Sequence, residues 1–154
     1  MMKKPVILVS ACLLGVCCRY DGESKPNSDV IALREQFTMI PICPEVDGGL
    51  STPRIPSERV GDKVLMKDGS DVTENYNSGA VAALERARLY GCNAAILKAR
   101  SPSCGSGKVY DGSFTGKLRD GDGVAAEMLK KNGIKVFSEE EIDEFKKYFL
   151  DNNN

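Results

Sequence analysis

The chain has 154 residues, with 21 basic and 22 acidic side chains and a formal net charge of −1. A chain of this length buries roughly 70% of the surface that its unfolded form exposes, and its balanced charge supplies no general field for nucleic acid or anionic membranes. The sequence contains no histidine, which excludes Ser-His-Asp and Cys-His catalysis and every zinc site that uses imidazole. Any chemistry must therefore use cysteine, carboxylate, serine, lysine, tyrosine or a cofactor.

Short apolar runs alternate with helical patterns along the chain. Four runs bounded by turn residues predict buried parallel strands, at Val6–Ala11, Thr38–Ile42, Ala94–Lys98 and Ile134–Phe137. Apolar residues at helical spacing predict helices, at about Asp29–Gln36, Glu74–Tyr90, Gly123–Asn132 and Glu140–Leu150. Strands that alternate with helices predict an α/β fold, three-layered and Rossmann-like, with a mostly parallel sheet.

The segment Gly48–Gly69 interrupts this alternation. Within it, Arg59–Met66 places a Gly-Asp turn between two short extended stretches, which predicts a small hairpin insertion. No linker or internal repeat divides the sequence. We therefore expect a single domain over residues 1–154, with its core at about residues 5–150.

The apolar run Pro5–Cys18 has the composition of a signal-peptide core, but we interpret it as a buried strand and the turn that follows. It contains Ser10 and ends at Arg19 without an Ala-x-Ala-like cleavage site. No stretch reaches the 18 apolar residues of a membrane span. We expect a cytoplasmic protein without a membrane partner, in which the six cysteines are free thiols or thiolate ligands.

Three cysteines follow three of the predicted strands. Cys12 comes directly after the first strand, Cys43 directly after the second, and Cys104 lies in the loop after the third. Ligands of parallel sheets bind outside the carboxyl ends of the strands, and neighbouring strands are about 4.8 Å apart. Three thiolates gathered there suit a soft metal or an iron–sulfur cluster. Their spacing matches no local ligand motif, so small buried hydrophobic residues are the alternative interpretation.

Polar residues flank these cysteines. Glu45 lies two residues after Cys43 and fits either a proton-transfer group or a solvated loop carboxylate. Ser101 and Ser103 precede Cys104 and are typical of turn or capping hydroxyls. Each of these residues therefore has a structural and a functional interpretation.

The remaining cysteines predict no ligand role. Cys92 precedes the third strand, at the opposite end of the sheet, and is expected to be structural. The vicinal pair Cys17-Cys18 cannot form a relaxed disulfide, so we interpret both as packing or accessory thiols at the mouth of a pocket. A thiol redox protein that uses this pair would leave the three cysteines after the strands unexplained.

Basic residues near the expected pocket are most simply interpreted as surface side chains. Arg54, Lys98 and Arg100 could supply positive charge there, but solvated surface cations are the default expectation for such residues.

Several separate motifs agree with one known family. They are Ser10-Ala11-Cys12-Leu13-Leu14-Gly15, Arg19-Tyr20-Asp21-Gly22, Cys43-Pro44-Glu45, Pro53-Arg54, Lys98-Ala99-Arg100-Ser101-Pro102-Ser103-Cys104-Gly105 and Tyr110-Asp111-Gly112-Ser113-Phe114. In this order, over about residues 5–140, they resemble the DUF523 family, whose characterised members are thiouracil desulfidases of the TudS type. The stretch Val16-Cys17-Cys18 departs from the family motif.

The resemblance implies a [4Fe-4S] cluster held by Cys12, Cys43 and Cys104, with one iron that lacks a protein ligand. Such an iron acts as a Lewis acid on a thiocarbonyl group, so that water replaces sulfur without net electron transfer. The resemblance further implies that Glu45 activates the water and that Ser101 orients the base or the substrate.

The same resemblance implies a small thiolated substrate, such as a thiolated pyrimidine, and no nucleic-acid partner. Its flat ring could rest against Tyr20 or Tyr110. A rival hypothesis is an iron–sulfur or three-cysteine zinc module that binds or delivers sulfur without turnover. The sequence carries no signal for the oligomeric state.

Overall fold

The main sheet consists of strands whose apolar side chains are buried on both faces. In the computed structural model, which describes residues 4–152, the strands β1 (Val6–Ser10), β2 (Thr38–Ile42), β5 (Ala94–Leu97) and β8 (Lys135–Ser138) pair in parallel in the order β2-β1-β5-β8. The three central residues of β1 are fully buried, because β2 and β5 flank this strand and helices cover it. The predicted parallel α/β fold is confirmed.

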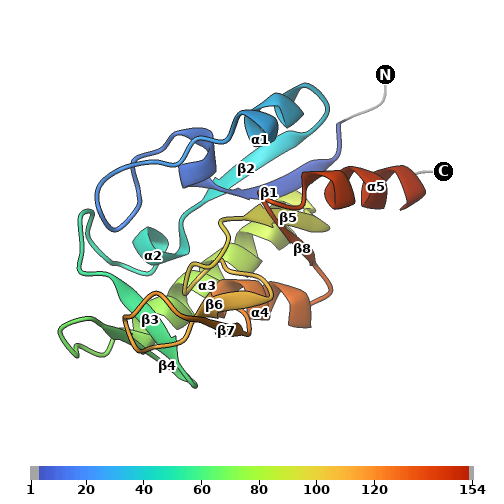
Figure 1. The fold of residues 1–154 in the computed structure, drawn as a ribbon. Helices are drawn as coiled ribbons and strands as arrows, with labels where there is room; N and C mark the ends of the chain where they lie inside the picture. Colours follow the sequence, from blue (N-terminus) through green and yellow to red (C-terminus); the bar gives the residue numbers. More distant parts are fainter. Residues whose placement is uncertain (1–3, 153–154) are drawn as a thin grey trace.

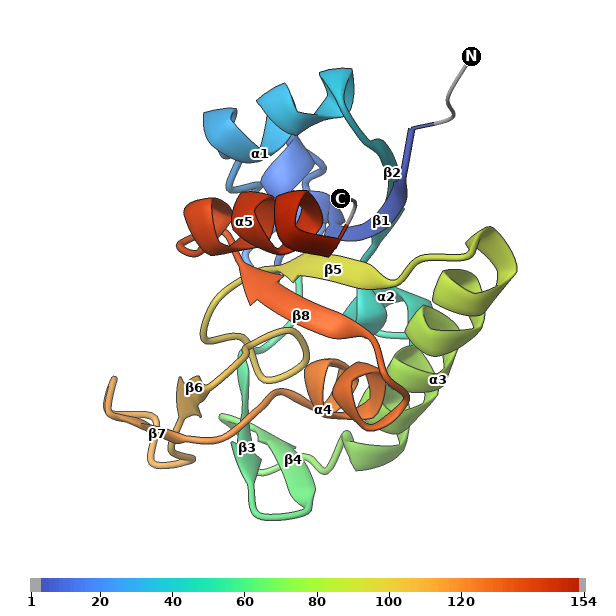
Figure 2. The ribbon, with the colours of Figure 1, turned by 90° about the vertical axis from the view of Figure 1, so that its right-hand side faces the viewer.

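Helices cover the two faces of the sheet, as Figures 1 and 2 show. On one face lie α1 (Ser28–Ala32) and α5 (Ile142–Asn152), and on the other lie α3 (Thr73–Tyr90) and α4 (Val124–Lys131). Each face has its own apolar core: Phe137 and Phe145 pack edge to face under α5, whereas Tyr76 and Leu129 belong to the core under α3 and α4. The fold therefore has three layers.

The order of the strands creates a switch point at the middle of the sheet. From β1 the chain passes to β2 on one side, and after α3 it returns to β5 on the other side of β1. The loops that follow β1 and β5 diverge there, which leaves a crevice at the carboxyl ends of the strands. Cys12 and Cys104 lie in these two loops.

Most predicted strands and helices lie within about two residues of their observed bounds, and the predicted helix Asp29–Gln36 divides into α1 and the 3-10 helix η2 (Leu33–Glu35). The predicted hairpin is β3 (Ser57–Val60) with β4 (Lys63–Met66). Elements absent from the prediction are the 3-10 helix η1 (Ala11–Leu14), the one-turn helix α2 (Pro44–Asp47), and the strands β6 (Lys108–Tyr110) and β7 (Leu118–Asp120). Segments of three or four residues show no periodicity of their own, and these lack the bounded apolar runs that indicate β5 and β8 and the two-residue turn that indicates the hairpin of β3 and β4.

Both views place the hairpin of β3 and β4 and the hairpin of β6 and β7 at the same end of the molecule (Figures 1 and 2). Within residues 4–152, no helix combines the length and the apolar character needed to cross a membrane.

Candidate functional site

One cavity of about 570 Å³ lies at the carboxyl ends of β1, β2 and β5. The structure brings to its wall every site residue predicted from the sequence, namely Cys12, Cys43, Glu45, Ser101 and Cys104. Within residues 4–152, no group of three or more Cys, His, Asp or Glu side chains is arranged so that it could hold a metal ion. The shared location is thus established, and the assignment of the three cysteines as ligands stays a prediction.

Each of the three cysteines comes from a different element. Cys12 lies in η1, Cys43 is the residue before α2, and Cys104 lies in the turn after β5. All three are free thiols. Burial raises the pKa of Cys104 to about 12, and a hydrogen bond with Cys18, together with burial, raises the pKa of Cys43. The thiols of Cys43 and Cys104 are therefore neutral, and any metal that binds these two residues must displace their protons.

A fourth thiol belongs to the same cavity. Cys18 is buried, and a hydrogen bond with Cys12 is the first of the causes that raise its pKa to about 11. Its carbonyl oxygen accepts hydrogen bonds from Cys43 Sγ at 3.7 Å and from Arg54 Nη2 at 2.9 Å. Cys17 is exposed. The sequence predicts the same accessory role for Cys17 and Cys18, but the first is exposed and the second is buried.

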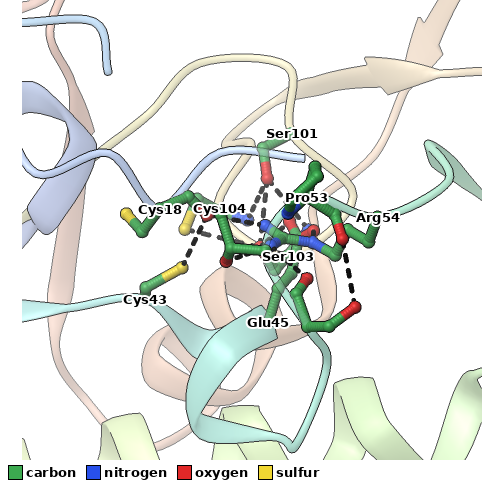
Figure 3. A network of polar contacts seen from close by, with 10 residues as sticks. Cys18, Cys43, Glu45, Pro53, Arg54, Ser101, Ser103 and Cys104 are labelled. Atoms are coloured by element: carbon green, nitrogen blue, oxygen red, sulfur yellow. Dashed lines mark hydrogen bonds and ion pairs between the residues drawn. The ribbon is translucent and has the colours of Figure 1, made fainter. Parts of the chain in front are cut away.

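Glu45 is held by charged and polar partners on both of its carboxylate oxygens. Oε1 accepts a hydrogen bond from Arg54 Nε at 3.0 Å, and Oε2 accepts one from Ser103 Oγ at 3.0 Å. Ser101 Oγ lies 3.0 Å from Ser103 Oγ. Figure 3 shows this chain of contacts beside the sulfur atoms of Cys18, Cys43 and Cys104. A carboxylate, two hydroxyls and the thiol of Cys104, which Ser103 Oγ also contacts at 3.5 Å, are therefore joined along one wall of the cavity.

The position of Glu45 depends on how α2 packs against α3. Gly79 of α3 makes this contact possible, because a Cβ there would lie 1.9 Å from the carbonyl oxygen of Pro44. The side chain of Asn75 donates to the carbonyl oxygen of Gly48 at 2.9 Å and closes the other end of the short helix. The long helix α3 thereby fixes the one-turn helix that carries Glu45.

The turn that carries Cys104 is fixed by hydrogen bonds from two directions. Ser101 Oγ accepts from the backbone N–H groups of Ser103 at 3.2 Å and Cys104 at 3.1 Å. At the start of α4, the N–H of Val124 donates to the carbonyl of Pro102 at 2.9 Å. Ser101 therefore has the turn-forming role that the sequence indicates, in addition to its place on the cavity wall.

The prediction of solvated cations is wrong for Arg54. Its side chain is only 4% exposed, and it pairs with Glu45, whose side chain is 14% exposed. Lys98 pairs with Glu139 at 2.8 Å, and the guanidinium of Arg100 pairs with the exposed Glu140. All three cations line the cavity. Pairing makes burial of Arg54 possible, because a buried charge needs an opposite charge and hydrogen bonds.

Sequence reasoning missed a role at the site for Ser103, which is 1% exposed and bonds to Glu45. It also missed Tyr76 of α3, whose pKa is raised by burial first and then by the charge of Glu45. The Pro53-Arg54 motif contained a signal for Arg54, and the Ser101–Gly105 motif contained one for Ser103. No signal for Tyr76 exists outside its helical periodicity.

Cys92 agrees with its prediction. It is buried at the start of β5, the end of the strand opposite the cavity, and burial raises its pKa to about 11. It does not line the cavity.

Together these features define a class of protein, a three-layer α/β domain with a thiol-lined cavity beside an arginine-paired carboxylate at the switch point of a parallel sheet. Residues 7–141 match the 2-thiouracil desulfurase family, so the chain belongs to that family. The DUF523 resemblance is thereby confirmed.

Two relatives are similar over almost the whole chain. The uncharacterized protein YbbK of Bacillus subtilis (strain 168) is 42% identical over 149 residues, which cover 90% of this chain and 99% of that protein. The solved structure of the [4Fe-4S]-dependent thiouracil desulfidase TudS (DUF523Vcz) is 44% identical, has a TM-score of 0.84, and the match covers 92% of this chain and 95% of that one.

Proposed function

We propose that this protein is a [4Fe-4S]-dependent desulfidase that replaces the thiocarbonyl sulfur of a thiolated pyrimidine, or of a related small molecule, by oxygen and releases sulfide. The observation that carries this proposal is the single cavity shared by Cys12, Cys43, Cys104 and Glu45. Membership of the family and the likeness to a [4Fe-4S]-dependent thiouracil desulfidase support it.

The thiol donors of the cavity have the chemistry that an iron–sulfur cluster needs, and they would have to draw together around it, because no three such side chains of residues 4–152 are grouped for a metal ion as they stand. Cys12, Cys43 and Cys104 would hold it, since thiolates are the ligands of such clusters, and one iron would then lack a protein ligand. When bound, the cluster would supply an open iron that acts as a Lewis acid for sulfur. The sequence contains no histidine that could replace a thiolate, and Cys18 is the other thiol that lines the cavity.

Glu45 would accept the proton of the attacking water. Its ion pair with Arg54 holds the side chain in one orientation, and Ser103 holds the other carboxylate oxygen. A positioned base of this kind contributes about 10²- to 10⁴-fold to a reaction rate. In a chain without histidine, this carboxylate is the base best placed to do so.

Ser101 and Ser103 would orient that base. Ser101 Oγ lies 3.0 Å from Ser103 Oγ, which in turn donates to Glu45. The same Ser101 hydroxyl accepts from the N–H of Cys104. A displacement of Ser101 would therefore disturb the base and one candidate ligand together.

The overall exchange is balanced without a redox partner: the thiocarbonyl and water give a carbonyl and hydrogen sulfide, and the oxidation state of carbon does not change. We infer a cytoplasmic, reducing setting for this chemistry, which the six free thiols support.

The test is anaerobic reconstitution with iron and sulfide, followed by incubation with 2-thiouracil or 4-thiouracil in ¹⁸O-labelled water. We expect about four irons and four sulfides per chain, sulfide release without added reductant, and uracil that carries ¹⁸O. Bound thiouracil without release of sulfide would instead favour the sulfur-binding module. A requirement for stoichiometric electrons would overturn the hydrolytic mechanism.

A further inference from the structure

A second buried carboxylate lines the same cavity. Glu58, on β3, is only 9% exposed. Its Oε1 accepts hydrogen bonds from the backbone N–H groups of Gly112 at 2.9 Å and Phe114 at 3.1 Å. These amides belong to the loop between β6 and β7, more than fifty residues away in the sequence. Glu58 therefore ties this loop to the cavity.

The loop presents an aromatic side chain at the cavity. Phe114 lines it, is half-buried, and has a φ of 57°, in the left-handed region that bulky residues rarely adopt. Backbone strain of this kind persists where the surrounding structure enforces it, and it is concentrated at ligand-binding sites. The ring of Phe114 contacts no other aromatic ring among residues 4–152. Phe114 thus presents to the cavity an aromatic side chain that is not stacked on another ring.

The second oxygen of Glu58 is also available. Among residues 4–152, the only hydrogen bonds of this carboxylate go to Oε1, and no cation pairs with it. No fully buried side-chain oxygen in this part of the chain lacks a partner, so Oε2 retains some contact with solvent. Glu58 is one of the residues that line the cavity, so this oxygen is a candidate to face it. A ligand that displaces solvent from this oxygen must supply a hydrogen-bond donor in its place.

We propose that Glu58 and Phe114 together form the recognition wall for a planar nitrogen heterocycle, in which Phe114 packs on the ring face and Glu58 Oε2 accepts a ring N–H. This inference rests on the proposed function and assigns its substrate specificity to two residues outside the predicted site. A ring N–H next to a thiocarbonyl is a strong donor, and an ionised acceptor roughly doubles the strength of the bond. The wall selects heterocycles that carry an N–H over those that do not.

Steady-state kinetics of the cluster-loaded enzyme with 2-thiouracil test the two residues. Glu58→Gln keeps one oxygen for the loop amides but replaces the other by a donor, so we expect the KM to rise about tenfold or more, with kcat within about twofold. Phe114→Leu should raise the KM about tenfold, whereas Phe114→Tyr, which keeps an aromatic ring, should have a KM close to that of the wild type. Iron content should be unchanged in all three. The matched control is Glu141→Gln, a carboxylate that also holds a backbone N–H but does not line the cavity.

Non-reactive probes separate recognition from a merely structural role. We would compare inhibition of the wild type by uracil, 1-methyluracil and 3-methyluracil. Methylation of the ring nitrogen whose N–H donates to Glu58 should weaken inhibition about tenfold in the wild type and less than about twofold in Glu58→Gln. If Glu58→Gln weakens all three probes equally, Glu58 only holds the loop and the proposal is wrong. Wild-type KM values in both the Glu58 and Phe114 variants would overturn it as well.

Failure of the proposed function can be distinguished from failure of this inference. An iron-loaded wild type that releases no sulfide from any thiouracil refutes the desulfidase activity. Calorimetric titration of the wild type and of Glu58→Gln with uracil then tests whether the recognition wall exists. Binding that is lost in Glu58→Gln supports it, and absence of binding to the wild type overturns it.

Discussion

The guanidinium of Arg54 donates from Nε to Oε1 of Glu45 at 3.0 Å, and both charged side chains are almost withdrawn from solvent. The same guanidinium donates to the carbonyl oxygens of Cys18 at 2.9 Å and Ser51 at 3.1 Å. Arg54 therefore joins the candidate base to the loop that carries the fourth thiol, and it does so without facing bulk solvent.

Loss of Arg54 leaves the Glu45 carboxylate without its counter-ion. We expect Arg54→Gln to lower the free energy of unfolding by about 3 kcal/mol, as for other broken buried pairs, and to lower sulfide release. Urea denaturation of the reduced protein measures the first effect. The double variant Glu45→Gln/Arg54→Gln should recover part of the stability. Equal stability of the single and double variants would contradict a charge-based penalty.

The three candidate ligands can be tested by metal content alone. Cys12→Ala, Cys43→Ala and Cys104→Ala should each abolish retention of four irons after anaerobic reconstitution, because each removes one of the three thiolates of the cluster. Cys92→Ala, at the other end of β5, should retain them. Should Cys92→Ala alone lose the iron, the ligand set would have to be revised.

Replacement of Glu45 by its amide removes the base and keeps its shape. We expect Glu45→Gln to retain iron and the visible spectrum, but to lower the rate of sulfide release from thiouracil by about 10²-fold or more. The measurement is sulfide production per iron-loaded chain. Full activity of this variant would exclude Glu45 as the proton acceptor.

Loss of either hydroxyl should have a smaller effect than loss of the Glu45 carboxylate. Ser103 bonds directly to Glu45, whereas Ser101 reaches it only through Ser103. We expect Ser103→Ala and Ser101→Ala to lower kcat by about tenfold, the scale of one lost hydrogen bond, and by less than Glu45→Gln. A loss of iron in Ser101→Ala would instead assign this residue to the turn of Cys104.

Cys92 provides a test of stability against pH away from the cavity. Burial raises its pKa from 9.0 to about 11, so the folded state keeps the thiol neutral while the unfolded state ionises. Its contribution is fully present below pH 9 and is lost as the pH rises through 11, by at most about 3 kcal/mol. The stability difference between the wild type and Cys92→Ala should therefore shrink over this range. Urea titrations at pH 8 and pH 11 measure it, and a constant difference would contradict the prediction.

The sequence by itself determined the strands, the long helices and the three thiols at the strand ends. Continuous apolar runs such as Val6–Ser10 predict buried strands locally, and a cysteine that directly follows a strand must lie at the edge of a parallel sheet. These features depend on neighbouring residues only. The absence of histidine likewise followed from the composition and narrowed the chemistry to thiols and carboxylates.

Only the tertiary structure decided which polar groups meet. Ser103 reaches Glu45 across 58 positions of the sequence, and Glu58 reaches Phe114 across 56. These residues lie in loops or short elements without periodicity, and their positions follow from packing elsewhere, such as the contact of Gly79 with Pro44. Long-range contacts of this kind are set by how whole elements pack, and a local pattern carries no information about their partners.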